Sequence, residues 1–304
     1  IQHLSHARNQ STSVGENKIR GTPKATLKKM PILRINQLHE IYLQCGLDKK
    51  KYDKPLYKYM DMGAAIRCIK ERKLRFVEPS CWNDQFEKLF YMATYCNVAP
   101  DVHPLLYANC FTKERMSEAA WQIYTHQGNG ISANCVQFSV DVTKLREELA
   151  SNIKNHPNWR FYEGLVDYQY DAKALTKLHL KNDRYEVRDE LFSNNFSLDN
   201  FMTLLLLKRN MFEHEKEYRF FLIDEDTKNH KKGQSKKGGY KGEAKEINID
   251  WDKVVTKISI NKTCSDLDLD IFISIATKYG IKKDIIQRLD IYKKPKKKIF
   301  ISIG

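Results

Sequence analysis

The sequence has no apolar run that approaches the ~20 residues needed to cross a bilayer. Its longest run, at 202–207, has the length of a segment buried in a protein core. The first residues are polar and lack the apolar stretch of a signal peptide. We therefore expect a soluble, cytoplasmic protein with no membrane partner.

Cysteine pairs and glycine-rich phosphate loops are also missing. The seven cysteines are odd in number and include no C-x-x-C pair, which disfavours both a disulfide framework and a zinc site. Their apolar neighbours are typical of small buried side chains in a reducing compartment. Neither common glycine-rich phosphate loop is present, and no 20- to 50-residue period repeats, so a solenoid is not indicated.

Positive charge is what the chain has in excess. There are 52 Lys and Arg residues against 38 Asp and Glu, which gives a formal net charge of +14 over 304 residues. Such an excess attracts polyanions and speeds their encounter with the protein. A nucleic acid, RNA or DNA, is therefore the expected partner, although a lysine-rich background composition would give the same count.

Composition divides the chain into three parts. Residues 1–30 are polar and basic, and we expect them to form a flexible arm. Residues 31–292 carry the apolar patterns of a single α+β domain, the expected catalytic domain, with a basic Gly- and Lys-rich loop at 228–245. Residues 293–304 form a basic tail that includes a last short strand.

Apolar periodicity predicts the elements of this domain. Helices are expected at 32–47, 117–124, 142–153, 198–208 and 268–279, and a further helix is expected to begin after an N-cap at Asp61. Strands are expected at 56–60, 74–77, 106–112, 131–140, 165–170, 218–223 and 254–260. Pro79 ends the strand at 74–77 because proline removes a ladder donor. Strands dispersed among helices, without a regular βαβ rhythm, indicate an α+β fold with a mixed or antiparallel central sheet.

Five motifs then occur in an ordered series. They are Leu56-Tyr57-Lys58-Tyr59; Leu74-Arg75-Phe76 with Asn83-Asp84-Gln85-Phe86-Glu87; Cys110-Phe111-Thr112; Trp121-x-x-Tyr124 with Gly130-Ile131; and Glu215-Lys216-Glu217-Tyr218-Arg219. Over residues 55–260 the chain resembles a bacterial family called domain of unknown function 2971, which opens with a YKYR strand and an NDPFE-like turn. Met60 and Gln85 stand where that family usually has Arg and Pro.

The layout of that family is similar to the ADP-ribosyltransferases of toxin and phage-defence systems. Those enzymes have an aromatic residue, His or Arg on a first strand, Ser or Thr on a second, and Glu at the start of a late strand. The resemblance implies an ADP-ribosyltransferase-like fold and an enzyme that uses NAD and no metal. It also implies an intracellular toxin, in phage defence or a toxin–antitoxin system, that modifies nucleic acid, RNA in preference, and has an antitoxin or chaperone protein as partner.

Transfer of ADP-ribose breaks the bond between ribose and nicotinamide through an oxocarbenium-like transition state, which a carboxylate stabilises. Glu217 is the first candidate for that carboxylate, and Glu215 is the second, to orient or activate the acceptor. The two lie two residues apart at the mouth of a strand, so both are expected on one face, where like charge raises one pKa. A salt bridge from either glutamate to Arg219 or Lys58 is the structural alternative.

The remaining candidates would hold NAD. Tyr57 and Tyr59 share one face of their strand, and Lys58 points the other way. Tyr59 is expected to stack on nicotinamide and so to take part in catalysis, while Tyr57 is expected to hydrogen-bond. The other candidate contacts are Lys58, Asn83, Thr112, Trp121, Tyr124 and Arg219. Core packing would equally explain Tyr57, Tyr59, Trp121 and Tyr124. An Asx-type turn that caps a helix would explain the polar cluster of Asn83, Asp84 and Glu87.

Two other functions fit the same residues. In a metal-dependent nuclease, Asp84, Glu87, Glu215 and Glu217 would bind Mg²⁺ through their oxygens. In a non-catalytic nucleic-acid-binding module, these carboxylates would be structural. NAD consumption that resists EDTA and requires Glu217 would separate the transferase from both.

Overall fold

The computed structural model describes residues 42–44, 52–88, 105–127, 131–132, 134–170, 178–181, 184–187, 202, 205–224 and 244–290. The chain divides into two units, Ile1–Arg34 and Ile35–Gly304, and every described residue lies in the second. The predicted arm at 1–30, the tail at 293–304 and residues 228–243 of the basic loop therefore lie outside the described residues.

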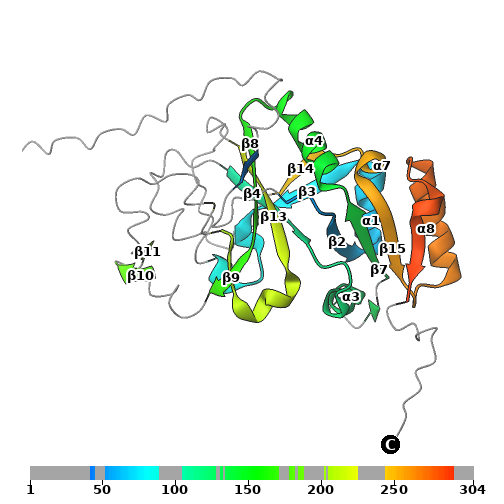
Figure 1. The fold of residues 1–304 in the computed structure, drawn as a ribbon, viewed down its shortest axis with the longest axis horizontal. Helices are drawn as coiled ribbons and strands as arrows, with labels where there is room; N and C mark the ends of the chain where they lie inside the picture. Colours follow the sequence, from blue (N-terminus) through cyan, green and yellow to red (C-terminus); the bar gives the residue numbers. More distant parts are fainter. Residues whose placement is uncertain are drawn as a thin grey trace, which may run out of the picture. The chain divides into compact units, whose positions relative to one another are not determined.

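The second unit combines helices and strands (Figure 1). Its α-helices are α1 (Met62–Glu71), α3 (Glu118–Thr125), α4 (Val142–Ile153), α7 (Trp251–Val254) and α8 (Asp266–Lys278), and its 3₁₀ helices are η2 (Pro79–Cys81), η4 (Asn210–Glu215) and η6 (Lys283–Ile285). Its strands are β1 (Tyr42–Gln44), β2 (Leu56–Asp61), β3 (Lys73–Val77), β4 (Leu105–Thr112), β5 (His126–Gln127), β6 (Ile131–Ser132), β7 (Cys135–Val140), β8 (Trp159–Leu165), β9 (Asp167–Tyr170), β10 (Leu178–Lys181), β11 (Arg184–Val187), β12 (Leu207–Arg209), β13 (Glu217–Asp224), β14 (Ala244–Asn248), β15 (Val255–Asn261) and β16 (Ile286–Leu289).

Within the described ranges, a 10-stranded sheet dominates the fold. Its main path runs β1-β8-β13-β4-β2-β7-β15-β16, while β3 pairs with β4 and with β14. The outer strands β1 and β16 run parallel to their neighbours, and the inner pairs are antiparallel. The predicted α+β class with a mixed sheet is confirmed at this level.

The sheet is nearly divided where β2 meets β4. In the described part of the chain one residue pair, Tyr57 with Thr112, joins these two strands. A side chain bridges the remaining interval, because the Lys58 Nζ donates to Asn109 Oδ1 and to the Cys110 carbonyl, both at 2.9 Å. This junction therefore leaves room for a pocket between two halves of one sheet.

The two faces of the sheet bury different clusters. The main core lies on the face covered by α1, α4, α7 and α8, and it receives the even-numbered apolar residues of β13. Phe221 and Ile223 point to the other face, where they pack with residues 202, 205 and 206. Since strand side chains alternate, Glu217 and Arg219 share this second face with Phe221. The second face therefore carries the candidate site.

Local signals predicted several elements correctly. Asp61 caps α1, since its Oδ1 accepts the Ala64 N–H at 2.8 Å. Strand β3 stops two residues before Pro79, as predicted. Helix α3 begins directly after Ser117, whose Oγ accepts the Ala120 N–H at 3.1 Å. Each of these signals acts over a few residues, which is why the sequence alone reveals them.

Two predicted helices are wrong where the structure describes them. Tyr42–Gln44, inside the helix predicted at 32–47, forms β1 beside β8. Leu207–Arg209, at the end of the helix predicted at 198–208, forms β12 beside β9 after a turn. In both cases, pairing with a strand far away in the sequence overrides a local helical pattern.

Other boundaries shift by a few residues. The strand predicted at 131–140 appears as β6 and β7, and that predicted at 165–170 appears as the end of β8 followed by β9. Ala244 and Lys245, at the end of the predicted basic loop, belong to β14 and pair with β3. The basic loop is therefore shorter than predicted.

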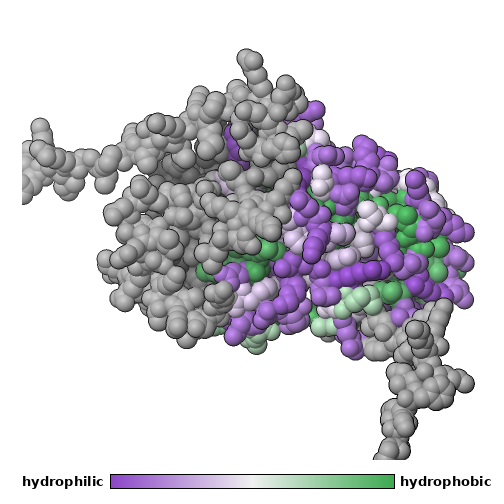
Figure 2. All heavy atoms as spheres, in the orientation of Figure 1, coloured by the Kyte–Doolittle hydropathy of each residue, from purple (hydrophilic) through white to green (hydrophobic). Residues whose placement is uncertain are grey.

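The described surface is mainly polar in the view of Figure 2, with apolar side chains showing at α8, where Leu267 and Ile271 are 70% and 45% exposed. No helix among the described residues is long and apolar enough to span a membrane. The described residues carry nearly equal numbers of basic and acidic side chains, so most of the excess positive charge lies elsewhere in the chain.

Candidate active site

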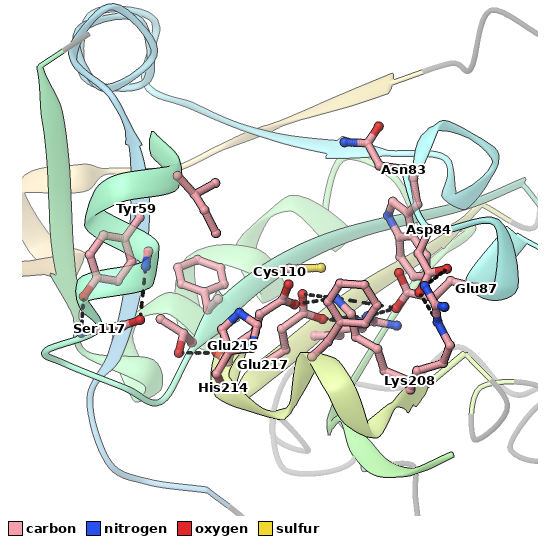
Figure 3. A pocket seen from close by; sticks show the side chains of 18 of the residues that line it. Tyr59, Asn83, Asp84, Glu87, Cys110, Ser117, Lys208, His214, Glu215 and Glu217 are labelled. Atoms are coloured by element: carbon pink, nitrogen blue, oxygen red, sulfur yellow. Dashed lines mark hydrogen bonds and ion pairs between the residues drawn. The ribbon is translucent and has the colours of Figure 1, made fainter. Parts of the chain in front are cut away.

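A pocket of about 710 Å³ opens at the junction of β2 and β4 (Figure 3). Its volume lies within the ~300–1,000 Å³ typical of small-molecule sites. The predicted site residues that line it are Tyr57, Lys58, Tyr59, Asn83, Thr112, Glu215, Glu217 and Arg219. Trp121 is not among the lining residues, and the side chain of Tyr124 lies outside the described part.

The sheet register brings the central candidates together. Glu217, the first residue of β13, pairs with Thr112 at the end of β4, and Thr112 pairs with Tyr57 on β2. Paired residues on neighbouring antiparallel strands point to the same face, with Cβ atoms about 5 Å apart. Three segments far apart in the sequence therefore present one acid, one hydroxyl and one aromatic ring side by side.

The two glutamates reach the pocket from different elements. Glu215 is the last residue of η4, and Lys216 between them adopts the left-handed conformation with φ of 45°. The prediction that both carboxylates lie on one face of a strand is therefore wrong, because Glu215 belongs to η4 and only Glu217 belongs to the strand. They converge nevertheless, because the Lys208 Nζ donates to Glu217 Oε1 at 3.0 Å and also to Glu215 Oε2.

Arg219 holds the second oxygen of Glu217. Its Nε and Nη2 donate to Glu217 Oε2 at 2.9 and 2.6 Å, and Nη2 also bonds to Glu87. The Nη1 donates to the Leu205 carbonyl at 2.6 Å, and the guanidinium lies 4.4 Å from the centre of the Trp82 ring. Only 1% of the Arg219 side chain is exposed. The predicted salt bridge between Glu217 and Arg219 thus exists inside the pocket wall.

This arrangement separates the pKa values of the two acids. Burial alone would raise the pKa of Glu217, but the charges of Arg219 and Lys208 outweigh it and lower that pKa to about 2. Burial, together with hydrogen bonding and repulsion from Glu217, raises the pKa of Glu215 to about 7. At neutral pH one carboxylate is therefore ionised while its neighbour exchanges a proton.

Lys58 is the pocket cation without an acidic partner in the described part of the chain. Lys208, Arg209 and Arg219 each pair with at least one carboxylate. Lys58 instead contacts neutral oxygens and lies 5.0 Å from the centre of the Phe111 ring. Burial lowers its pKa. An uncompensated cation at a pocket wall favours an anionic ligand group such as a phosphate.

The two tyrosines of β2 differ in how accessible their rings are from the pocket. Tyr59 is 5% exposed, its hydroxyl donates to the Arg115 carbonyl at 3.0 Å, and burial raises its pKa to about 12. Its hydroxyl also accepts the Ser117 N–H at 3.3 Å, and its ring meets the buried Trp121 edge to face. Tyr59 and Trp121 therefore build the wall, and the half-buried Tyr57 is the more accessible ring.

Thr112 connects the pocket floor to η4. Its Oγ1 donates to the Glu215 carbonyl at 2.6 Å and accepts the Glu114 N–H at 3.0 Å. The Glu217 N–H in turn donates to the Tyr168 hydroxyl at 2.7 Å. These bonds fix the backbone on both sides of Lys216 and so orient the two carboxylates.

The opposite end of the pocket carries a second ion pair. Asp84 accepts a hydrogen bond from Arg209 at 3.0 Å and another from the Phe86 N–H at 2.9 Å, which is the Asx turn expected there. The Arg209 guanidinium lies 4.3 Å from the Phe86 ring and 5.0 Å from the Phe212 ring. The exposed Asn83 lines the pocket beside this pair.

Lys208 is the main residue that sequence reasoning missed. The helix predicted at 198–208 ends at Lys208, and that prediction gives its side chain no role in a site. The Lys-Arg pair that closes this run was the available signal, because such a run turns polar where it leaves a core. Trp82 and Cys110 also line the pocket, and both lie within or beside the motifs that were recognised.

In the described ranges, no group of three His, Cys, Asp or Glu side chains is arranged to hold a metal ion. Comparison with known family models, with curated proteins and with solved structures finds no match for this chain. The motifs and the chemistry of the pocket therefore carry the functional proposal.

Proposed function

We propose that the protein transfers ADP-ribose from NAD to a nucleic acid, with RNA favoured. The observation that carries the proposal is the adjacency of β13, β4 and β2, which sets Glu217, Thr112 and Tyr57 in one row at a single pocket. These are the late-strand acid, second-strand hydroxyl and first-strand aromatic of the ADP-ribosyltransferase layout. An intracellular toxin in phage defence or a toxin–antitoxin system is the role such an activity would serve.

Glu217 supplies the charge that the reaction needs. The bond between the ribose C1′ and the nicotinamide nitrogen breaks, its electron pair leaves with nicotinamide, and positive charge develops on the ribose. The Glu217 carboxylate is ionised at neutral pH and is held by Arg219 and Lys208, so it faces that charge without reorganising.

Glu215 serves the acceptor. A nucleophilic oxygen or nitrogen that bonds to C1′ must lose a proton, and a group with a pKa near the working pH accepts it best. The pKa of Glu215 is raised to about 7, and 29% of its side chain is exposed toward the pocket. It therefore fits a general base beside the ionised Glu217.

The rest of the pocket suits the other parts of NAD. Lys58 offers an unpaired ammonium to the pyrophosphate. Tyr57 and Trp82 offer ring surfaces for nicotinamide or adenine. Tyr59, whose hydroxyl is already bonded, acts by shaping the wall.

The nuclease alternative is weaker for a specific reason. Each of its four proposed ligands already binds a cationic side chain, Asp84 with Arg209 and Glu87, Glu215 and Glu217 with Arg219 or Lys208. A divalent cation would have to displace these cations from a largely buried network.

The test incubates purified protein with labelled NAD and, separately, total RNA, DNA and lysate protein, with and without EDTA. Wild type should label nucleic acid in EDTA, and Glu217→Gln should reduce labelling by at least 100-fold, on the order of the loss of a main electrostatic group. Glu213→Gln is the matched control, since Glu213 is an exposed acid in η4, four residues before Glu217. Absence of both labelling and NAD loss would refute the transferase, and cleavage abolished by EDTA would establish the nuclease.

A further inference from the structure

The candidate acid lies at one end of a row of paired residues that crosses five strands. The row runs Glu217, Thr112, Tyr57, Ser139 and Lys257, on β13, β4, β2, β7 and β15. Residues paired in this way point to the same face of a sheet. Four strand spacings of about 4.8 Å place Lys257 roughly 19 Å from Glu217 on the pocket face.

The loop after β4 brings two further cations over this face. The Lys113 N–H donates to the Lys216 carbonyl at 2.9 Å, which ties the start of the loop to the end of η4. The Arg115 carbonyl accepts hydrogen bonds from the Tyr59 hydroxyl at 3.0 Å and from Gln137 Nε2 at 2.6 Å. The loop therefore crosses β2 and β7 next to the pocket wall, where Tyr59 and Ser117 stand close together in Figure 3.

Lys216, Lys113, Arg115 and Lys257 form what we call the basic stripe. Burial lowers the pKa of Lys113, and repulsion from Lys216 lowers it further. Burial likewise lowers the pKa of Lys257, with repulsion from Arg115 adding to it. Lys113 and Lys216, and likewise Lys257 and Arg115, are therefore close enough to repel each other electrostatically.

The stripe is poorly neutralised by the protein itself. Lys113, Arg115 and Lys257 form no ion pair with a carboxylate of the described residues, whereas Lys216 pairs with the exposed Glu213 at 2.7 Å. The described residues as a whole are nearly balanced in charge. A concentration of uncompensated cations beside one pocket is therefore a local feature and does not follow from the average composition.

We infer that the basic stripe binds the phosphate backbone of a single-stranded nucleic acid and directs one of its nucleotides into the pocket. This inference rests on the proposed function, because it names the substrate class of the same site. A linear array of cations matches successive phosphates, and a base can enter a pocket only from a single strand or after flipping out of a duplex. Ile123, which lines the pocket and is 57% exposed, offers an apolar surface to a base.

The test removes three charges of the stripe in the full-length chain, with Lys113→Gln, Arg115→Gln and Lys257→Gln combined. The control combines Lys278→Gln, Lys282→Gln and Lys283→Gln, which are exposed lysines at α8 and η6 and which change the net charge equally. Binding of a labelled oligouridylate is measured at several salt concentrations. Thermal melts verify that both variants stay folded.

The stripe variant should lose about 2 units of the slope of log K against log salt, since each phosphate contact on a single strand contributes about 0.7. Between about 50 and about 200 mM salt, wild type should then lose roughly 20-fold more affinity than the stripe variant. The control variant should keep the wild-type slope. Equal slopes in the two variants would overturn the inference.

Two further outcomes separate the explanations. Polyglutamate that competes with oligouridylate as well as an unlabelled oligonucleotide does would mean an acidic polypeptide partner and would overturn the nucleic acid. A stripe-dependent slope in a protein that consumes no NAD would support the stripe while refuting the proposed transferase. If the slope does not depend on the stripe while the protein labels nucleic acid, the stripe inference is refuted and the transferase is supported.

Discussion

Replacing Glu215 by Gln should make the protein more stable relative to wild type as the pH rises. The pKa of Glu215 is raised from 4.5 to about 7 in the folded state by burial and by Glu217. A raised folded-state pKa means that the carboxyl stabilises the fold fully below about pH 4.5, and that this contribution is lost as the pH rises through about 7. Gln does not ionise, so it avoids the loss.

The magnitude follows from the shift. The folded-state and unfolded-state pKa values of Glu215 differ by about 2.5, and each pKa unit corresponds to about 1.36 kcal/mol. The unfolding free energy of wild type should therefore fall by roughly 3 kcal/mol relative to Glu215→Gln between pH 4.5 and pH 8. The assay is urea unfolding of wild type and Glu215→Gln at several pH values, comparing the difference in unfolding free energy and not its absolute value. Glu213→Gln, at an exposed acid on the same 3₁₀ helix, should show no comparable trend. A difference for Glu215→Gln that stays flat with pH would refute the reasoning.

Three other substitutions test the packing around the site. Arg146→Met should lower the unfolding free energy by about 3–5 kcal/mol in thermal or urea unfolding, because it removes the guanidinium that neutralises the buried Glu163 carboxylate; Arg146→Lys should recover part of the loss. Tyr59→Phe should cost about 1–3 kcal/mol by the same assay, as it removes the hydrogen bonds that the hydroxyl donates to the Arg115 carbonyl and accepts from the Ser117 N–H. Lys208→Met should cost about 3–5 kcal/mol at pH 8 and less at pH 5, since its carboxylate partners protonate more readily without it; an effect that grows as the pH falls would contradict this.

Elements with short-range causes could be read from the sequence. The alternation at 56–60, the cap at Asp61 and the stop at Pro79 depend on neighbours within a few residues, and the structure has them where they were predicted. The helices predicted at 32–47 and 198–208 failed at Tyr42–Gln44 and Leu207–Arg209, because β1 and β12 exist only through pairing with β8 and β9. No local pattern encodes such a partner.

The candidate site shows the same division. The motifs identified Glu215, Glu217 and Arg219, since these stand together in the sequence. Lys208, which binds both glutamates, was missed because its role depends on a fold that carries β12 to the start of β13. Trp121 was recognised as part of a motif, yet it is 4% exposed and supports Tyr59 from behind the wall.

At the junction of β2 and β4, a single described backbone pair, Tyr57 with Thr112, connects the two halves of the sheet. We expect the core beneath the sheet to set the width of the pocket, because Phe111, which lines the pocket, packs edge to face on the buried Phe220. Ordinarily a core residue contributes to stability alone. Here, a smaller side chain beneath the junction would change the spacing between β2 and β4, so Phe220→Leu, at a fully buried residue that does not line the pocket, should alter ligand affinity.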